Sequence, residues 1–164
     1  MHILKRQQLQ IILSWIAVLL WMFLIFVLSA QPAPRSNGLS QKVTEVIIEK
    51  VGLLVPLDIK TSTTIDLIKR FNHIVRKCAH VSEYFVLGAL VTNAMKTSKV
   101  PRFKAFIFSV LLCVFYAISD EVHQLFVPGR GAQMMDVLID SAGAIAGIGC
   151  IFLIKRRNST PYVE

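Results

Sequence analysis

The chain has 164 residues, of which 54% are hydrophobic, and it carries a formal net charge of +8. This length allows one domain, and so high an apolar content excludes an ordinary soluble domain. We therefore predict an all-α integral membrane protein with a single domain over residues 1–164, since helices satisfy their own backbone hydrogen bonds in lipid. Membrane topology accounts for the basic charge, as shown below, so no nucleic-acid partner is expected.

Four apolar segments have about the length needed to cross a hydrocarbon core, which takes ~20 helical residues. They are residues 9–28, 74–95, 103–119 and 137–154, and we predict that they form a four-transmembrane-helix bundle. The first segment also resembles a secretory signal peptide, with Lys5-Arg6 before it and Leu28-Ser29-Ala30 after it. Its apolar run is too long for a typical signal peptide, so we favour a retained span.

A polar outer segment, residues 31–72, connects the first two spans. It begins with Pro32 and Pro34, which prevent helix continuation. Over residues 40–54 apolar side chains recur at helical spacing, which predicts an amphipathic helix on the outer membrane surface or over the bundle. A solvated connecting helix is the alternative. Thr63-x-x-Asp66 is a candidate capping box for a second helix that continues into the span at 74–95.

Basic residues indicate the orientation of the spans. If four spans are counted, one side of the membrane holds nine bases and one acid, Glu164, so the whole net charge of +8 lies there. The nine bases are Lys5, Arg6, Lys96, Lys99, Arg102, Lys104, Lys155, Arg156 and Arg157. The positive-inside rule assigns this side to the cytoplasm. We therefore expect a multi-pass protein of the cell membrane with both termini in the cytoplasm.

Small residues in the last span predict how the helices pack. Gly143-x-x-x-Gly147 is a pattern that allows two helices to approach closely. We favour packing within the chain over dimerisation.

Ionisable residues on three different spans are predicted to lie at one depth. Counting from Lys96, Lys104 and Lys155 places His80, Asp120 and Asp140 ~23 to 24 Å from the basic side, at 1.5 Å per residue. On the second span, Arg76, His80, Glu83 and Tyr84 also share one helical face, being at i, i+4, i+7 and i+8. Charged groups in hydrocarbon are costly, so such a layer indicates a functional site.

We predict that this layer forms a recessed polar pocket open to the cell exterior. Its ligand-binding residues are Arg76, His80, Glu83, Tyr84, Asp120, Glu121, Gln124, Arg130, Asp136 and Asp140. The structural alternative is that Arg76 pairs with Glu83 and Arg130 with Asp136 to set helix register, with Tyr84 as an interfacial anchor. No metal or cofactor is included in the prediction, although His80, Glu83, Asp120 and Glu121 offer nitrogen and oxygen ligands.

Two blocks of residues in this layer give the chain a resemblance to a known family. One block is Arg76-Lys77-x-Ala79-His80-x-x-Glu83-Tyr84-x-x-x-Gly88. The other is Ser119-Asp120-Glu121-x-His123-Gln124-x-Phe126-x-Pro128-Gly129-Arg130, continued by Asp136-Val137-x-x-Asp140-x-x-Gly143. With these blocks the chain resembles the VanZ-like family of bacterial membrane proteins. The resemblance implies a role in the cell envelope that affects susceptibility to glycopeptides of the teicoplanin type.

Three classes of function follow from the pocket and the resemblance. The first is a binding protein for the head group of a lipid-linked cell-wall precursor or an amphiphilic antibiotic, with membrane lipids as further partners; Arg76 and Arg130 would hold phosphate or carboxylate. The second is an enzyme that modifies an envelope lipid or glycolipid by acid–base or metal-assisted chemistry, with His80, Glu83 and Asp120 as catalytic candidates. The third is a transporter, which is disfavoured because the four spans have no obvious duplicated half.

Overall fold

The structure is a computed structural model that describes residues 2–32, 46 and 62–157. In these residues all of the regular secondary structure is helical. The long helices are α1 (His2–Ser29), α3 (Ser62–Thr97), α4 (Arg102–Gln124) and α5 (Met134–Arg157). The predicted amphipathic helix over residues 40–54 lies outside the described residues, apart from Val46. The expected helix after Thr63 is part of α3, which runs without a break into the stretch predicted as the second span.

Helix boundaries follow local chemistry. α1 ends at Ser29, three residues before Pro32, and α4 starts directly after Pro101. Between α3 and α4 the chain turns within four residues, and Lys99 takes the left-handed conformation there, with φ 59°. After α4, Gly129 takes φ 77°, which a residue without a Cβ adopts at little cost. These turns return the chain along the bundle.

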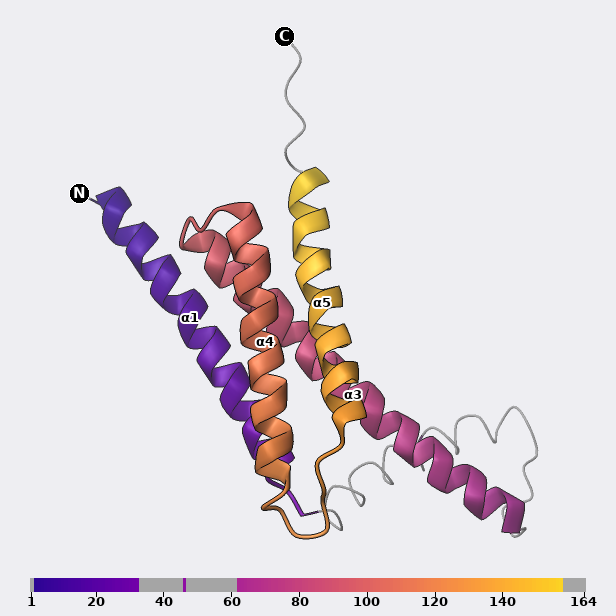
Figure 1. Ribbon diagram of the computed structural model, residues 1–164. Coiled ribbons are helices and arrows are strands. Elements are labelled where there is room, and N and C mark those ends of the chain that lie inside the picture. Colours follow the sequence, from indigo (N-terminus) through magenta and orange to yellow (C-terminus); the bar gives the residue numbers. More distant parts are fainter. Residues whose placement is uncertain (1, 33–45, 47–61, 158–164) are drawn as a thin grey trace.

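Figure 1 shows α1, α4 and α5 running alongside one another, with α3 crossing them at a steeper tilt. α3 packs against all three other helices, most extensively against α5, and its N-terminal part extends beyond the bundle. α1 begins, α3 gives way to α4, and α5 ends at the same end of the bundle. The basic clusters around Lys5, Lys96 and Lys104 are therefore all at this end of the bundle, in agreement with their predicted location on one side of the membrane.

Three of the described helices are long and apolar enough to cross a membrane, namely Lys5–Ser29, Arg102–Gln124 and Met134–Ile154. Leu20, Phe115 and Leu153 on these helices are each more than 60% exposed, as expected for side chains that face lipid. The stretch predicted as the second span, residues 74–95, is less apolar. Its first turns contain several charged or ionisable residues, namely Arg76, Lys77, His80 and Glu83. The molecule is a membrane protein, and the prediction of four apolar spans is confirmed for three.

α3 and α5 pack at close range through small residues. A Cβ on Gly143 would lie 2.6 Å from the carbonyl oxygen of Val81, and one on Gly147 would overlap the carbonyl oxygen of Phe85. On α3, Gly88 is equally close to α5, because a Cβ added to it would overlap the main chain of Ala144. The face with Gly143 and Gly147 is therefore used for packing within the chain, as predicted.

The buried side of α4 changes character along its length. Toward its start the buried residues are small, and toward its end they are polar. In order, they are Ala105, Ser109, Cys113, Ala117, Asp120, Glu121 and Gln124. The core of the bundle, which includes Val18, Ile25 and Leu87, surrounds the small residues. The buried polar residues at the end of α4 lie in the part of the bundle next to the loop between α4 and α5.

Candidate functional site

A cavity of about 110 Å³ lies between the middle of α3, the loop after α4 and the start of α5. Six of the predicted site residues line it: Arg76, His80, Gln124, Arg130, Asp136 and Asp140. Five lining residues were not predicted: Lys77, Gly129, Gly131, Gln133 and Ile139. A water needs ~10 to 15 Å³ of such space, so the cavity has room for several waters or for a small polar group.

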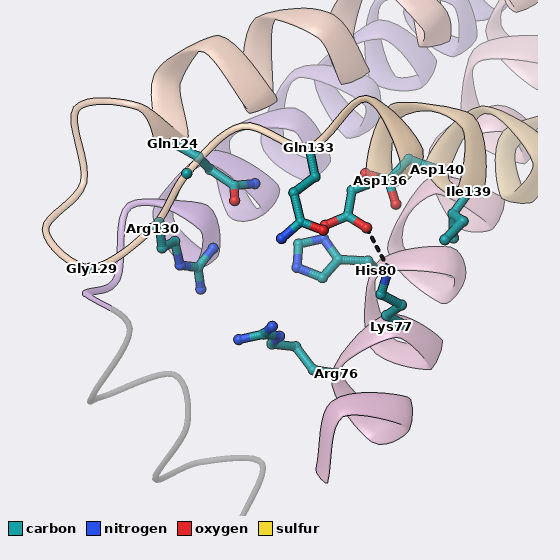
Figure 2. Close-up of a pocket in the computed structure, with 11 residues that line it drawn as sticks. Arg76, Lys77, His80, Gln124, Gly129, Arg130, Gln133, Asp136, Ile139 and Asp140 are labelled. Atoms are coloured by element: carbon teal, nitrogen blue, oxygen red, sulfur yellow. Dashed lines mark hydrogen bonds and ion pairs between the residues drawn. The ribbon is translucent and has the colours of Figure 1, made fainter. Parts of the chain in front are cut away.

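Two arginines face this cavity from different parts of the chain. Figure 2 shows Arg76, from α3, and Arg130, from the loop after α4, directed into the same space. Arg130 is half-buried, and its Nε atom has no hydrogen-bond partner in the structure. Burial lowers the pKa of the Arg130 guanidinium, and the positive charge of Arg76 lowers it further, against the opposing effect of Asp120. Arginine nevertheless stays protonated in proteins, so two positive charges face one small cavity.

Lys77 and Asp136 form a salt bridge at the side of the cavity. The Nζ atom of Lys77 lies 2.7 Å from Oδ1 of Asp136, and the two side chains are 28% and 31% exposed. The pair joins α3 to the first turn of α5 (Figure 2). Asp136 thus has Lys77 as its salt-bridge partner, and the structural alternative that paired it with Arg130 is wrong.

Asp120 and Glu121 lie behind the cavity rather than on its wall. Ser29 Oγ, at the end of α1, donates a hydrogen bond of 2.8 Å to Oδ2 of Asp120. Gln124 Nε2 donates to the same Asp120 oxygen at 3.1 Å and to Glu121 Oε1 at 3.2 Å. The main-chain N–H of Gln133 donates to Glu121 Oε2 at 2.8 Å. This network connects α1, α4 and the loop, and it leaves the second oxygen of Asp120 without a partner.

His80, Asp120 and Asp140 converge from three helices. Each supplies one nitrogen or oxygen atom, and these three atoms lie within 4.8 Å of one another. Asp140 is 1% exposed and both of its carboxylate oxygens are buried without a hydrogen-bond partner. The side chains that helix counting placed at one level therefore meet. Among the described residues this is the set that could hold a metal ion, and it contains Asp140 where the sequence suggested Glu83 and Glu121.

Glu83 and Tyr84 were predicted to bind ligand but do not line the cavity. Tyr84 is fully buried in the core, where its ring lies 6.2 Å from the ring of Tyr116. A fully buried ring cannot be an interfacial anchor, so that alternative is wrong. Glu83 flanks the histidine, with Oε2 3.9 Å from Nδ1 of His80, and its main-chain oxygen accepts a hydrogen bond from Trp21 Nε1.

Three of the residues that sequence reasoning missed donate hydrogen bonds in this region, namely Lys77, Ser29 and Gln133. Lys77 belongs to the family-like block and is one helical turn before His80, so its spacing was a usable signal. Ser29 was visible as the polar end of an apolar helix. Gln133 acts through its main-chain N–H, which depends on the path of the loop and has no sequence signal.

The fold and this site define a helical membrane protein with a polar recess, lined by both basic and acidic side chains, next to one inter-helix loop. Comparison with models of protein families identifies the family of the chain. It belongs to the VanZ/LLP1 family, whose family model matches residues 14–155. The match extends well beyond the blocks that suggested the resemblance, and it includes the segment between α1 and α3. No curated protein and no solved structure matches the chain.

Proposed function

We propose that this protein binds the phosphate-bearing head group of an envelope lipid in the cavity between α3 and the loop after α4. The observation that carries the proposal is the convergence of Arg76 and Arg130 on one small cavity. Two like charges facing the same space repel each other, and an anion between them removes that repulsion. Guanidinium groups bind phosphate through two parallel hydrogen bonds, which suits them to a head group more than to a lone ion.

The surrounding residues support an anion rather than a cation at the mouth of the cavity. Lys77 neutralises Asp136, so this acid does not cancel the charge of the arginines. Both oxygens of Glu121 and one oxygen of Asp120 accept hydrogen bonds from Gln124, Gln133 and Ser29. Among the charged side chains that line the cavity, three are basic, namely Arg76, Lys77 and Arg130, and two are acidic, namely Asp136 and Asp140.

The position of the cavity agrees with recognition at a membrane surface. It lies next to the loop after α4, at the end of the bundle opposite the basic clusters. The positive-inside rule assigns the basic end to the cytoplasm, with both termini, and the cavity then faces the cell exterior. A lipid-linked cell-wall precursor presents its head group at that surface. Membership of the family suggests a connection with glycopeptide resistance, and occupation of such a head group would alter the access of a glycopeptide to it.

The test is retention of lipid by the purified protein. The full chain in detergent is incubated with an envelope lipid extract, washed, and analysed by mass spectrometry. Arg76→Gln and Arg130→Gln should each reduce retention of phosphate-bearing lipids roughly 10- to 100-fold, because a hydrogen bond to a charged group contributes about 1.5–3 kcal/mol. Arg102→Gln is the matched control, since Arg102 lies at the other end of the bundle over the ring of Phe152. Equal retention by all three variants would refute the proposal.

A second candidate is an enzyme acting on the same lipid. The observation that favours it is the group of His80, Asp120 and Asp140 at the cavity, in which both carboxylates are buried. His80 would act as general acid or base, with Asp120 or Glu83 orienting it. The same mass spectra separate the two functions. A lipid that is converted by the wild type, and not by His80→Gln or Asp120→Asn, would establish an enzyme.

A further inference from the structure

We propose that His80, Asp120 and Asp140 form a binding site for one divalent transition cation, with Zn²⁺ as the ion that the ligands suit best. The three residues come from α3, α4 and α5, and one ligand atom from each lies within 4.8 Å of the other two. This inference does not depend on the head-group proposal, because the cation and the lipid are tested separately.

The burial of Asp140 is the observation that points to a missing partner. The side chain is 1% exposed, and neither carboxylate oxygen has a hydrogen-bond partner in the part of the chain that the structure describes. Asp120 is 3% exposed, and its Oδ1 atom is also without a partner. Buried charged groups are normally paired or coordinate a metal, and an unpaired carboxylate costs several kcal/mol to bury. Three orphaned carboxylate oxygens beside an imidazole therefore fit a bound cation.

The neighbours of the three residues resemble the surroundings of metal ligands. Ser29 and Gln124 both donate to Oδ2 of Asp120, which orients the carboxylate and leaves Oδ1 for the ion. Glu83 lies 3.9 Å from the imidazole of His80, where it can orient the ring. Asp136, although only one turn from Asp140, has Lys77 as its partner and is not part of the group.

The ligand types and distances favour a transition metal. Ca²⁺ and Mg²⁺ prefer oxygen ligands throughout, whereas an imidazole nitrogen with two carboxylates suits Zn²⁺ or Mn²⁺. Tetrahedral zinc places its ligand atoms ~3.4 Å apart. The ligand atoms here lie within 4.8 Å of one another, so side-chain movements of about an ångström would bring them to the spacing that zinc requires. His80 and Asp140 also line the cavity, so a fourth position on the ion would open to it.

The experiment uses untagged, full-length protein in detergent, stripped with a chelator and dialysed against micromolar Zn²⁺ without added lipid. Bound metal is counted by elemental analysis, and affinity is measured by calorimetry. The wild type should bind one Zn²⁺ per chain, and its melting temperature should rise when Zn²⁺ is added. Asp140→Asn and His80→Gln should each lower the affinity at least 10-fold and remove the thermal shift, since loss of even an outer partner of a metal ligand costs about 10- to 100-fold.

Asp136→Asn is the matched control, because it makes the same chemical change one helical turn away on α5. This variant should bind Zn²⁺ within about threefold of the wild type, as a substitution outside the ligand set should. The proposal is overturned if the wild type binds no Zn²⁺, or if Asp140→Asn binds as well as the wild type. Equal loss in Asp136→Asn and Asp140→Asn would also overturn it, because binding would then reflect general acidity.

Discussion

The close contact between α3 and α5 predicts opposite effects for one substitution at two neighbouring glycines. Gly147→Ala places a methyl group against the carbonyl oxygen of Phe85 and 3.2 Å from the main-chain nitrogen of Ala89. Gly149→Ala places the same methyl group where, apart from the adjoining backbone of its own helix, no described atom lies within 4 Å. Both substitutions favour the helix by about 0.5–1 kcal/mol. The difference between the two variants therefore measures the cost of forcing the helices apart.

The size of this cost follows from the atoms involved. Extra methyl or methylene groups in a packed core usually cost about 1–3 kcal/mol. At Gly147 the obstacle is backbone, which cannot rotate away, so the upper half of that range applies. We expect Gly147→Ala to be about 2–3 kcal/mol less stable than Gly149→Ala. Unfolding of both variants in the same mixed micelles, followed by circular dichroism, measures the difference. Equal stability, or a more stable Gly147→Ala, would refute the close packing of α3 on α5.

Two further predictions concern polar contacts in the bundle. Ser29→Ala removes one donor to Asp120 and should destabilise the protein by about 1–2 kcal/mol, because the carboxylate is buried and keeps only part of its hydrogen bonding. Ser14→Ala, on the exposed side of the same helix, should change stability by less than about 0.5 kcal/mol, and a similar loss in both would contradict the special role of Ser29. For Lys77 and Asp136, a double-mutant cycle with Lys77→Met and Asp136→Asn should give a coupling of about 0.5–1 kcal/mol, since both side chains are partly exposed. A coupling of zero in unfolding experiments would show that the salt bridge contributes nothing.

Much of the fold could be predicted from hydrophobicity and helix-breaking residues. Apolar runs locate α1, α4 and α5, and prolines and turn residues mark where the helices end. α3 was harder, because its length includes a charged stretch that lowers its apolarity while its C-terminal half packs in the core. The sequence prediction counted residues 74–95 as a span like the other three, whereas α3 is not among the helices apolar enough to cross a membrane.

The candidate site was predicted in outline and corrected in detail. Counting residues along straight helices sufficed to bring His80, Asp120 and Asp140 together, because helical rise is constant. It did not identify which charges pair, since neighbouring side chains such as Arg130 and Lys77 both reach the region of Asp136. The choice depends on helix rotation and on the path of the loop.

The amino-acid sequence by itself determined that the chain is a helical membrane protein with its net positive charge toward one side and a layer of acidic residues near the other. These properties depend on composition, periodicity and charge order, which are local along the chain. Tertiary structure decided that Asp120 and Glu121 lie behind the cavity, that Tyr84 belongs to the core, and that the Asp140 carboxylate has no hydrogen-bond partner among the described residues. The reason is that burial and pairing depend on how helices rotate and approach one another, and this follows from contacts between residues far apart in the sequence.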